Sequence, residues 1–400
     1  MNNNAKRINN LIFLLLFVLS LMVTGCNSKK ESNNNDKIST GTDTGNDVSD
    51  EAPYIEGLHF KEEVSLDYAE CFSIYRYEEG YSVIEVNDGR NYLVVPEDAA
   101  IPEGTEGYFI IKKPVLNIYL ASTSTMALFN AMDSLDAVGM TSLRAKDWHI
   151  DNVVSAMEDE EILFAGKYSE PDYELLLDEN CNLAIENTMI LHTPEVQEKL
   201  EELGITVFID CSSYEEHPLG RSEWIKVYAE LTDRQEEAEL FFRAQKDVVD
   251  SLAQYENTQK TVAYFYINES GSVVVRKSSD YIPKMIEIAG GHYIFENLGD
   301  DEESASSSTN ISMEEFYNQA KDADYLIYNA TIDNPLNSID ELIGKNALFS
   351  EFKAVKNDNV WCTEKNMFQA TDVIGNIIND YHTVFTDDNA EKLEFMYRIH

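Results

Sequence analysis

Positively charged residues are scarce in this chain of 400 residues. It has 30 lysines and arginines against 73 aspartates and glutamates, so its formal net charge is −43. So negative a chain repels the phosphate backbone of DNA and RNA, which argues against a nucleic acid as its partner. The charge is otherwise typical of a soluble, exposed surface protein.

Cysteine is also rare, with five in the chain. Cys71, Cys181, Cys211 and Cys362 are widely spaced and form neither a CxxC pair nor a metal-binding pattern. An exported protein can form disulfides, but a disulfide framework normally has more cysteines at closer spacing. We therefore expect isolated buried thiols, with disulfide pairing as the alternative.

Recognisable catalytic motifs are missing too. The sequence has no G-x-S-x-G, no H-E-x-x-H and no G-x-x-x-x-G-K-[ST]. Its seven histidines are scattered, and no Asp-Pro-His occurs, which disfavours direct capture of zinc or manganese. We predict that the protein is not an enzyme and carries no cofactor or resident metal. A surface-tethered hydrolase and a purely structural envelope lipoprotein are the alternatives from other classes.

Long apolar runs are limited to the N-terminus. Two cations precede the apolar run at residues 11–23, which is too short to span a bilayer comfortably. The run leads into Thr24-Gly25-Cys26, which is typical of a bacterial lipobox. We therefore predict a lipoprotein signal peptide at residues 1–25 and lipidation of Cys26. The following residues, 26–53, are rich in Asn, Ser, Asp, Thr and Gly, and are predicted to form a disordered tether.

Residues 54–113 have the pattern of a small β module. Alternating apolar residues at 81–86 and 92–95 flank Asp88-Gly89, and an Asp-Gly pair in this context predicts a hairpin. We therefore expect short strands here, ahead of the main domain.

The rest of the mature chain predicts two α/β lobes. Strands and helices alternate at residues 114–217, with a first helix expected at 126–135, and again at residues 259–400. Such alternation favours mostly parallel sheets with helices on both faces, as in Rossmann-like lobes. Residues 218–258 contain a long helical stretch, from Ser222 to about Tyr255, divided at Thr232-Asp233, and are expected to connect the lobes. An exposed loop is expected at 301–310 and a closing helix at 372–385.

Several stretches in this order resemble the class III substrate-binding proteins of ABC importers. They are Asp172–Leu176 followed by Asn182–Ile185, Glu216–Trp224, Ile311–Phe316 followed by Ala323–Ile327, and Ala347–Phe349 followed by Ala354–Val360. The resemblance covers most of residues 117–400 and leaves out the β module.

The resemblance implies capture of an iron-siderophore-type chelate for a membrane permease and its ATPase. Haem or cobalamin is the alternative ligand within the same family. The protein would be a monomer at the outer face of the cytoplasmic membrane, held by its lipid. One glutamate on each lobe, Glu174 and Glu314, would dock onto arginines of the permease. Both acids also suit a helix N-terminus, and Ser312 with Glu315 forms a capping box. Stabilisation of a helix N-terminus is therefore the alternative role of these glutamates.

The ligand is expected between the lobes, at loops after the carboxyl ends of strands. Hydroxyl groups are the first candidates, although each could instead cap a helix. Aromatic residues in loops could stack on a chelate, and cations could bind an anionic one. The candidates are Ser122, Thr123, Ser124, Trp148, Lys167, Tyr168, Arg221, Tyr266, Arg276 and Phe368. His217, before Pro218, is expected to be a structural hydrogen-bonding group, with axial ligation of haem iron as the alternative.

Overall fold

The computed structural model describes residues 52–298 and 307–400. The predicted signal peptide, the lipidation site Cys26 and the tether up to residue 51 lie outside the described residues, as do residues 301–306 of the expected loop.

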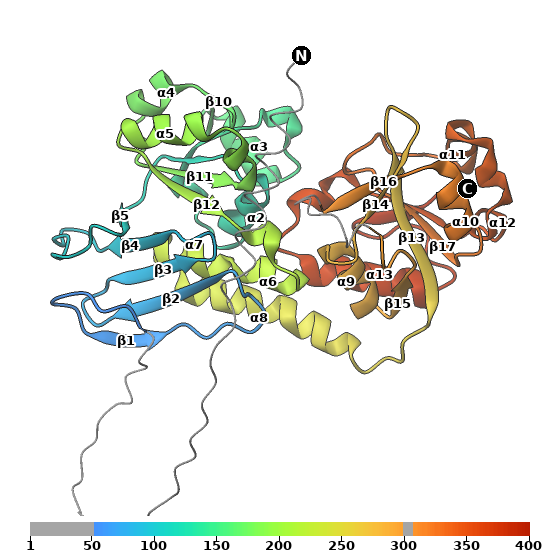
Figure 1. Cartoon of the computed structure of the whole chain (residues 1–400), viewed down its shortest axis with the longest axis horizontal. Coiled ribbons are helices and arrows are strands. Elements are labelled where there is room, and N and C mark those ends of the chain that lie inside the picture. The colour runs from blue at the N-terminus through green and yellow to red at the C-terminus, as the bar shows by residue number, and fades with distance from the viewer. Residues whose placement is uncertain (1–51, 299–306) are drawn as a thin grey trace, which may run out of the picture. The chain divides into compact units, whose positions relative to one another are not determined.

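The β module is a five-stranded sheet with the order β1-β2-β3-β4-β5, drawn in blue and cyan in Figure 1. Strands β1 to β4 are antiparallel neighbours, and β5 pairs with β4 in parallel. The predicted hairpin is confirmed, since Gly89 takes a φ of 88° in the turn between β3 and β4. The strands are Phe60–Glu63 (β1), Phe72–Tyr77 (β2), Ser82–Val86 (β3), Asn91–Val95 (β4) and Phe109–Lys112 (β5).

The two faces of this sheet differ in what they cover. One face, with Tyr75, Val83 and Leu93, closes a small apolar cluster of the module itself. The other face, with Ile74, Ile84 and other alternate residues, belongs to the same apolar core as the lobes. The module is therefore fused to the main domain through a shared core, rather than set ahead of it as a separate unit.

The N-terminal lobe has a fully parallel sheet with the order β12-β11-β6-β7-β8. Its strands are Ile118–Leu120 (β6), Val138–Thr141 (β7), Leu163–Phe164 (β8), Leu183–Asn187 (β11) and Thr206–Asp210 (β12). Its helices are Thr123–Ala131 (α2), Asp151–Glu158 (α3), Tyr173–Asp178 (α4) and Pro194–Glu202 (α5), and Gly166–Lys167 (β9) pairs with Glu170–Pro171 (β10). Helix α2 begins three residues before the predicted start, because Ser122, in an extended conformation, forms the N-cap directly after β6.

Three helices follow, at Pro218–Glu223 (α6), Ile225–Thr232 (α7) and Gln235–Leu252 (α8), drawn in yellow-green and yellow in Figure 1. The predicted division is confirmed, since Asp233 ends α7 in the left-handed conformation with a φ of 56°. The helical stretch begins at Pro218, which is earlier than Ser222, because a proline at the first position suits a helix start. Helix α8 packs against both α7 and the last helix of the chain, α13 (Ile374–Thr386).

The C-terminal lobe has a seven-stranded sheet with the path β16-β14-β13-β17-β18-β19, and β15 pairs with β13. Strands β13, β15, β17 and β18 are parallel neighbours, while β14, β16 and β19 are antiparallel to theirs. The strands are Lys260–Ile267 (β13), Val273–Arg276 (β14), Gly291–Tyr293 (β15), Ser308–Ile311 (β16), Tyr325–Tyr328 (β17), Val360–Thr363 (β18) and Met396–Arg398 (β19). The other helices are Tyr281–Ile288 (α9), Met313–Ala320 (α10), Ile339–Lys345 (α11) and Lys353–Lys356 (α12).

Two expectations for this lobe were wrong. Ser308–Ile311 forms β16 where an exposed loop was expected, because the polar residues there pair with β14 at the edge of the sheet. The chain also continues beyond the terminal helix into β19, which pairs with β18. The prediction of isolated thiols is confirmed, since Cys71, Cys181, Cys211 and Cys362 are all buried and free.

Candidate functional site

A pocket of about 720 Å³ receives side chains from both lobes and from α6 between them. The N-terminal lobe contributes residues that follow the carboxyl ends of β6, β11 and β12, as parallel sheets generally do for ligand sites. The lining residues are Thr123, Ser124, Thr188, Met189, His192, Ser213, Tyr214, Arg221, Arg276, Asp280, Tyr281, Ser307 and Phe368. Five of these, Thr123, Ser124, Arg221, Arg276 and Phe368, are among the residues proposed from the sequence.

The hydroxyl loop after β6 divides into a buried residue and two pocket residues. Ser122 is 1% exposed, and its hydroxyl forms a hydrogen bond with Thr125 Oγ1 at 2.9 Å. Thr123 and Ser124 are half-buried in the first turn of α2 and line the pocket. The structure therefore places two of the three hydroxyl groups where a ligand can reach them.

A buried carboxylate fixes this first turn. Asp210, at the end of β12, accepts hydrogen bonds from Thr125 Oγ1, from the Tyr228 hydroxyl at 2.5 Å and from the Ser212 amide at 2.8 Å. Because Thr125 lies on α2 and Tyr228 on α7, these bonds tie the wall of the pocket to the connecting helices. This role could not be predicted from the sequence, because Thr125, Asp210 and Tyr228 lie in separate segments of the chain.

On the C-terminal side, Arg276 ends β14 and is already paired. Its Nη1 lies 3.5 Å from Asp280 Oδ2 and donates to Ser307 Oγ at 3.1 Å. Burial alone would lower the pKa of Arg276, but the Asp280 carboxylate raises it, so the guanidinium stays charged. Asp280 also caps α9 by accepting from the Ile282 amide at 3.0 Å, so the cap that fixes this helix start also holds the arginine.

Arg221 is the other cation of the pocket. It projects from α6, and its guanidinium carbon lies 3.9 Å from the ring centre of Tyr281, the first residue of α9. Within residues 52–298 and 307–400, no carboxylate pairs with this guanidinium. In a chain of net charge −43, an arginine left without a counter-charge in a pocket is suited to an anionic ligand.

Exposed apolar side chains complete the pocket. Met189, Tyr214 and Phe368 are 47%, 46% and 39% exposed, which is unusual for large apolar residues and leaves their surfaces free for an apolar or aromatic part of a ligand. Met189 and Tyr214 could have been found from the sequence, because each follows an apolar strand within a few residues.

Besides Ser122, four proposed ligand contacts are absent from the pocket lining. Trp148 is 4% exposed and packs in the core, rather than standing in a loop ready to stack on a ligand. Lys167 and Tyr168 belong to the small β9–β10 hairpin and its turn, and Tyr266 lies on β13, none of them among the lining residues. A loop sequence is a weak guide to whether a side chain is exposed, because exposure depends on how the loop packs against other elements.

Glu174 and Glu314 occupy the same position within their helices, one on each lobe. Each is the exposed second residue of its helix, α4 or α10. The caps are made by other residues, since Asp172 accepts from the Leu175 amide at 3.1 Å and Ser312 accepts from the Glu315 amide at 3.1 Å. Neither glutamate is required as the N-cap, so both carboxylates are available to a partner.

The histidines fall into different environments. His192 lines the pocket and is exposed. The expectation for His217 is confirmed, because its Nδ1 accepts a hydrogen bond from the Leu219 amide at 3.2 Å and caps α6. Burial, followed by the nearby charge of Lys284, lowers the pKa of His217 to about 4. In the described part of the chain, no group of three or more His, Cys, Asp or Glu residues could hold a metal ion.

Comparison with known proteins identifies the family. The model of the periplasmic binding protein family matches residues 130–366. The chain belongs to this family. The match takes in most of both lobes and all of α6 to α8, and it leaves the β module outside.

Two relatives match the chain over most of its length. The chain is 24% identical to an uncharacterized lipoprotein of Methanocaldococcus jannaschii over 388 residues, which covers 90% of this chain and 87% of the relative. A second uncharacterized lipoprotein of the same organism is 23% identical and covers 83% of this chain and 86% of its own length. Because the part of the chain that the first relative does not cover is shorter than the module, that relative shares at least part of the β module.

Solved structures share the fold of the two lobes. The petrobactin-binding protein YclQ of Bacillus subtilis has a TM-score of 0.57 at 12% identity, covering 77% of this chain and 99% of that one. The periplasmic haem-binding protein HutB of Vibrio cholerae has a TM-score of 0.55 at 15% identity, covering 68% of this chain and 99% of that one. In the described residues of the present protein, no helix has the length and apolar character needed to cross a membrane.

Proposed function

We propose that this protein is the solute-binding lipoprotein of an ABC importer and that it captures an anionic, iron-siderophore-type chelate. The observation that carries the proposal is the pocket between the lobes of a periplasmic binding protein, with Arg221 free of any counter-charge among the described residues. A volume of about 720 Å³ is in the range of sites for ligands of several hundred daltons.

In this proposal the pocket residues have distinct roles. The Arg221 guanidinium binds an anionic group of the chelate, and the hydroxyl groups of Thr123 and Ser124 orient it through hydrogen bonds. Tyr214 and Phe368 contact its aromatic or apolar parts. Arg276 contributes less net charge, because Asp280 already neutralises it.

Several hydrogen bonds join the C-terminal lobe to the N-terminal lobe or to the connecting helices, and they favour a small hinge movement during capture. The Gln369 side chain donates to the Asp147 carbonyl at 2.9 Å and accepts from the His149 amide at 2.8 Å, and Ser222 Oγ donates to the Thr371 carbonyl at 2.7 Å. The Gly375 amide donates to Gln245 Oε1 of α8 at 3.0 Å. Wide closure would break these bonds, so we propose that the loaded protein docks on the permease with its lobes little changed.

The first prediction concerns ligand class. A ferric chelate at about 100 times its Kd should add roughly 2.7 kcal/mol to the free energy of unfolding, which a thermal-shift assay detects. The chain from residue 52 onward, without the predicted signal peptide and tether, is screened with ferric citrate, ferric 2,3-dihydroxybenzoate, ferrioxamine B, haemin and cyanocobalamin. Bare ferric, zinc and manganese ions are the controls. Arg221→Gln should weaken an anionic chelate about tenfold or more, because a charge-assisted contact is lost.

Arg243→Gln is the matched control for this screen, because Arg243 lies on α8 and pairs with Glu239 at 2.7 Å outside the pocket. Stabilisation by zinc or manganese alone would contradict the proposed ligand class. An anionic chelate that binds the Arg221→Gln variant with unchanged affinity would contradict the assigned role of Arg221.

The second prediction concerns the anchor. We propose lipidation at Cys26 and attachment to the outer face of the cytoplasmic membrane, which the lipobox pattern supports. Replacing Cys26 by serine should move the protein out of the membrane fraction or leave its signal uncleaved, since the thiol is the attachment point. Membrane fractionation with intact-mass measurement checks this, and Cys71→Ser is the control. Unchanged fractionation and mass would show that Cys26 is not the anchor.

A further inference from the structure

The loop between β1 and β2 of the β module, residues 64–71, binds both ends of helix α6. The Glu223 carboxylate, at the end of α6, accepts from the backbone amides of Asp67, Tyr68 and Ala69 at 2.8–2.9 Å. The Glu215 carboxylate, just before α6, accepts from the amides of Glu70 and Cys71 at 2.9 and 3.0 Å. Consecutive amides of one loop therefore meet two acids that flank one short helix.

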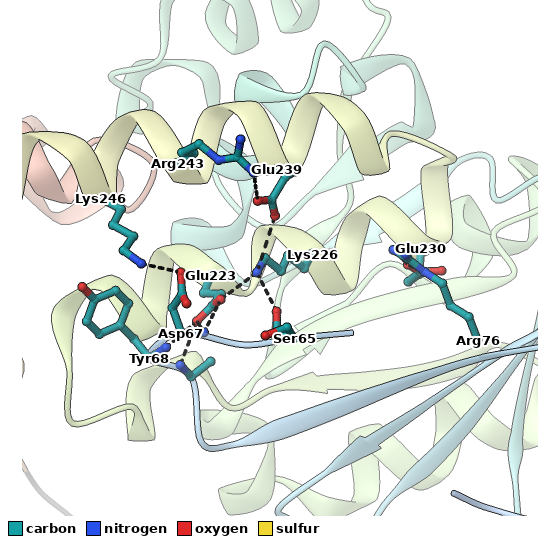
Figure 2. A network of polar contacts seen from close by, with 11 residues as sticks. Ser65, Asp67, Tyr68, Arg76, Glu223, Lys226, Glu230, Glu239, Arg243 and Lys246 are labelled. Atoms are coloured by element: carbon teal, nitrogen blue, oxygen red, sulfur yellow. Dashed lines mark hydrogen bonds and ion pairs between the residues drawn. The ribbon is translucent and has the colours of Figure 1, made fainter. Parts of the chain in front are cut away.

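These two carboxylates are buried but compensated. Glu223 is 0% exposed, and Lys226 Nζ lies 2.8 Å from its Oε1 while donating to the Ser65 carbonyl of the same loop at 2.9 Å (Figure 2). Glu215 also accepts from Trp224 Nε1 at 2.8 Å. Hydrogen bonds to a buried charge are stronger than those between neutral groups. Removing one partner of a buried ion pair is costly, because it leaves the other charge buried without compensation.

The loop and the helix also fit closely. A Cβ added at Gly220, in the middle of α6, would lie 3.1 Å from the Tyr68 carbonyl oxygen and 3.1 Å from Glu215 Oε2. The Tyr68 ring stacks on the imidazole of His217, the N-cap of α6, with ring centres 4.2 Å apart and planes 19° apart. The module thus contacts α6 at its start, its middle and its end.

Helix α6 has only six residues, which is too short to be stable by itself. Its position therefore depends on what holds it, and the module loop supplies most of the polar contacts at its two ends. Arg221, the pocket cation that has no carboxylate partner among the described residues, lies on this helix next to Ser222, which is bound to the C-terminal lobe.

We propose that Glu215 and Glu223 are positioning residues of the ligand pocket, through which the β module fixes α6 and holds Arg221 over Tyr281. The inference rests on the proposed function, and it gives the module a role in binding that the two lobes alone do not explain. The module would set the place of the pocket cation rather than contact the ligand.

A second attachment of the module provides the matched control. Arg76 Nη2 of β2 lies 2.5 Å from Glu230 Oε1 on α7. Glu230 comes seven residues after Glu223, and Figure 2 shows its pair with Arg76 apart from the contacts of Glu223. Glu230 is nearly as buried as Glu223, at 3% exposed, but it is not on α6. Replacing it should loosen the module without touching the helix that carries Arg221.

The experiment uses the chain from residue 52 onward and compares three variants. Glu223→Gln removes a buried charge, Tyr68→Leu removes only ring contacts, and Glu230→Gln is the control. Each variant is tested for its melting temperature, for the rate at which phenylglyoxal labels Arg221, followed by peptide mass spectrometry, and for its affinity for ferric 2,3-dihydroxybenzoate. We expect Glu223→Gln and Tyr68→Leu to raise the labelling rate of Arg221 at least about threefold and to weaken the probe about tenfold. Glu230→Gln should lower the melting temperature by a few degrees and leave labelling and affinity as in the wild type.

The labelling measurement needs no ligand, so it separates this inference from the proposed function. If the wild type does not bind the probe but labelling of Arg221 still rises in the two test variants, the positioning role stands and the proposed ligand class fails. Unchanged labelling in folded Glu223→Gln and Tyr68→Leu would overturn the positioning role. An equal rise in Glu230→Gln would overturn it as well, because the effect would then be general loosening.

Discussion

Reversing both Glu174 and Glu314 to lysine should nearly abolish uptake of the ferric chelate by intact cells while leaving its affinity for the purified protein unchanged. The two carboxylates are exposed, each is the second residue of a helix, one on each lobe, and both are absent from the pocket lining. In the proposed docking each faces an arginine of the permease, and a lysine placed there brings like charges together at a cost of several kcal/mol. Each single reversal should give a smaller loss than the double reversal.

Two other acids make matched controls for this test. Glu195 is the exposed second residue of α5, and Asp340 is the exposed second residue of α11. A lysine at any of these four positions loses the favourable interaction of an acid with the helix N-terminus, worth about 0.3–1 kcal/mol. Only Glu174→Lys and Glu314→Lys should impair uptake, since only these acids are proposed to dock.

The helix-cap alternative makes a different prediction. It expects a similar small fall in melting temperature for all four reversals and normal uptake wherever the protein stays folded. Melting temperature, ligand affinity and uptake are therefore measured on the same variants. Normal uptake by the folded double variant would contradict the docking proposal.

Replacing Glu186 by methionine should stabilise the protein strongly at alkaline pH. Glu186 lies on β11, is 0% exposed, and neither of its carboxylate oxygens has a hydrogen-bond partner among the described residues. Burial raises the pKa of Glu186 to about 8 from the ordinary value of 4.5. An ionised carboxylate without donors is costly in such a place, and a methionine of similar length removes that cost.

The sign of the pH dependence follows from this raised pKa. The neutral carboxyl is favoured in the folded protein, so its contribution to stability is fully present below pH 4.5 and is lost as the pH rises through about 8. A shift of this size corresponds to roughly 3–5 kcal/mol. Its titratable neighbours, Tyr119 and Tyr173, have pKa values raised first by burial and then by the charge of Glu186, so they stay neutral over this range.

Urea unfolding at pH 5, 7 and 9 measures the effect. The difference in unfolding free energy between Glu186→Met and the wild type should be largest at pH 9 and shrink towards pH 5. Glu198→Met, which removes an exposed acid of α5, should show little dependence on pH. A constant difference across this range would contradict the raised pKa.

Part of the fold follows from local sequence alone. Asp88-Gly89 specifies the β3–β4 turn, Pro194 starts α5, and the alternation of apolar strands with amphipathic helices indicates two α/β lobes. These features are local because each depends on backbone preferences or on apolar periodicity within one segment. Polar strands at a sheet edge, such as β16, lack that periodicity, and their formation depends on a partner strand.

The ligand site could be predicted from short sequence segments less completely than the fold. The sequence indicated Thr123, Ser124, Arg221, Arg276 and Phe368 as candidates, because loops after strands and charged or aromatic residues are common in pockets. It also indicated Trp148, whose burial depends on packing that no short segment reveals.

By itself, the sequence determined the class of the protein: an acidic chain with a predicted lipid anchor and two α/β lobes joined by helices. Only the tertiary structure decided which charges are free and which are compensated. Arg276 and Arg221 look alike in sequence, yet Arg276 pairs with Asp280, whereas Arg221 pairs with no carboxylate in the part of the chain that the structure describes. In the sequence, nothing distinguishes Glu215 and Glu223 from the other acids among the 73. In the structure, both accept hydrogen bonds from the backbone amides of a loop some 150 residues earlier in the chain. Charge compensation depends on distances between segments remote in the chain, and those distances are fixed only when the core of the lobes and the module packs as one.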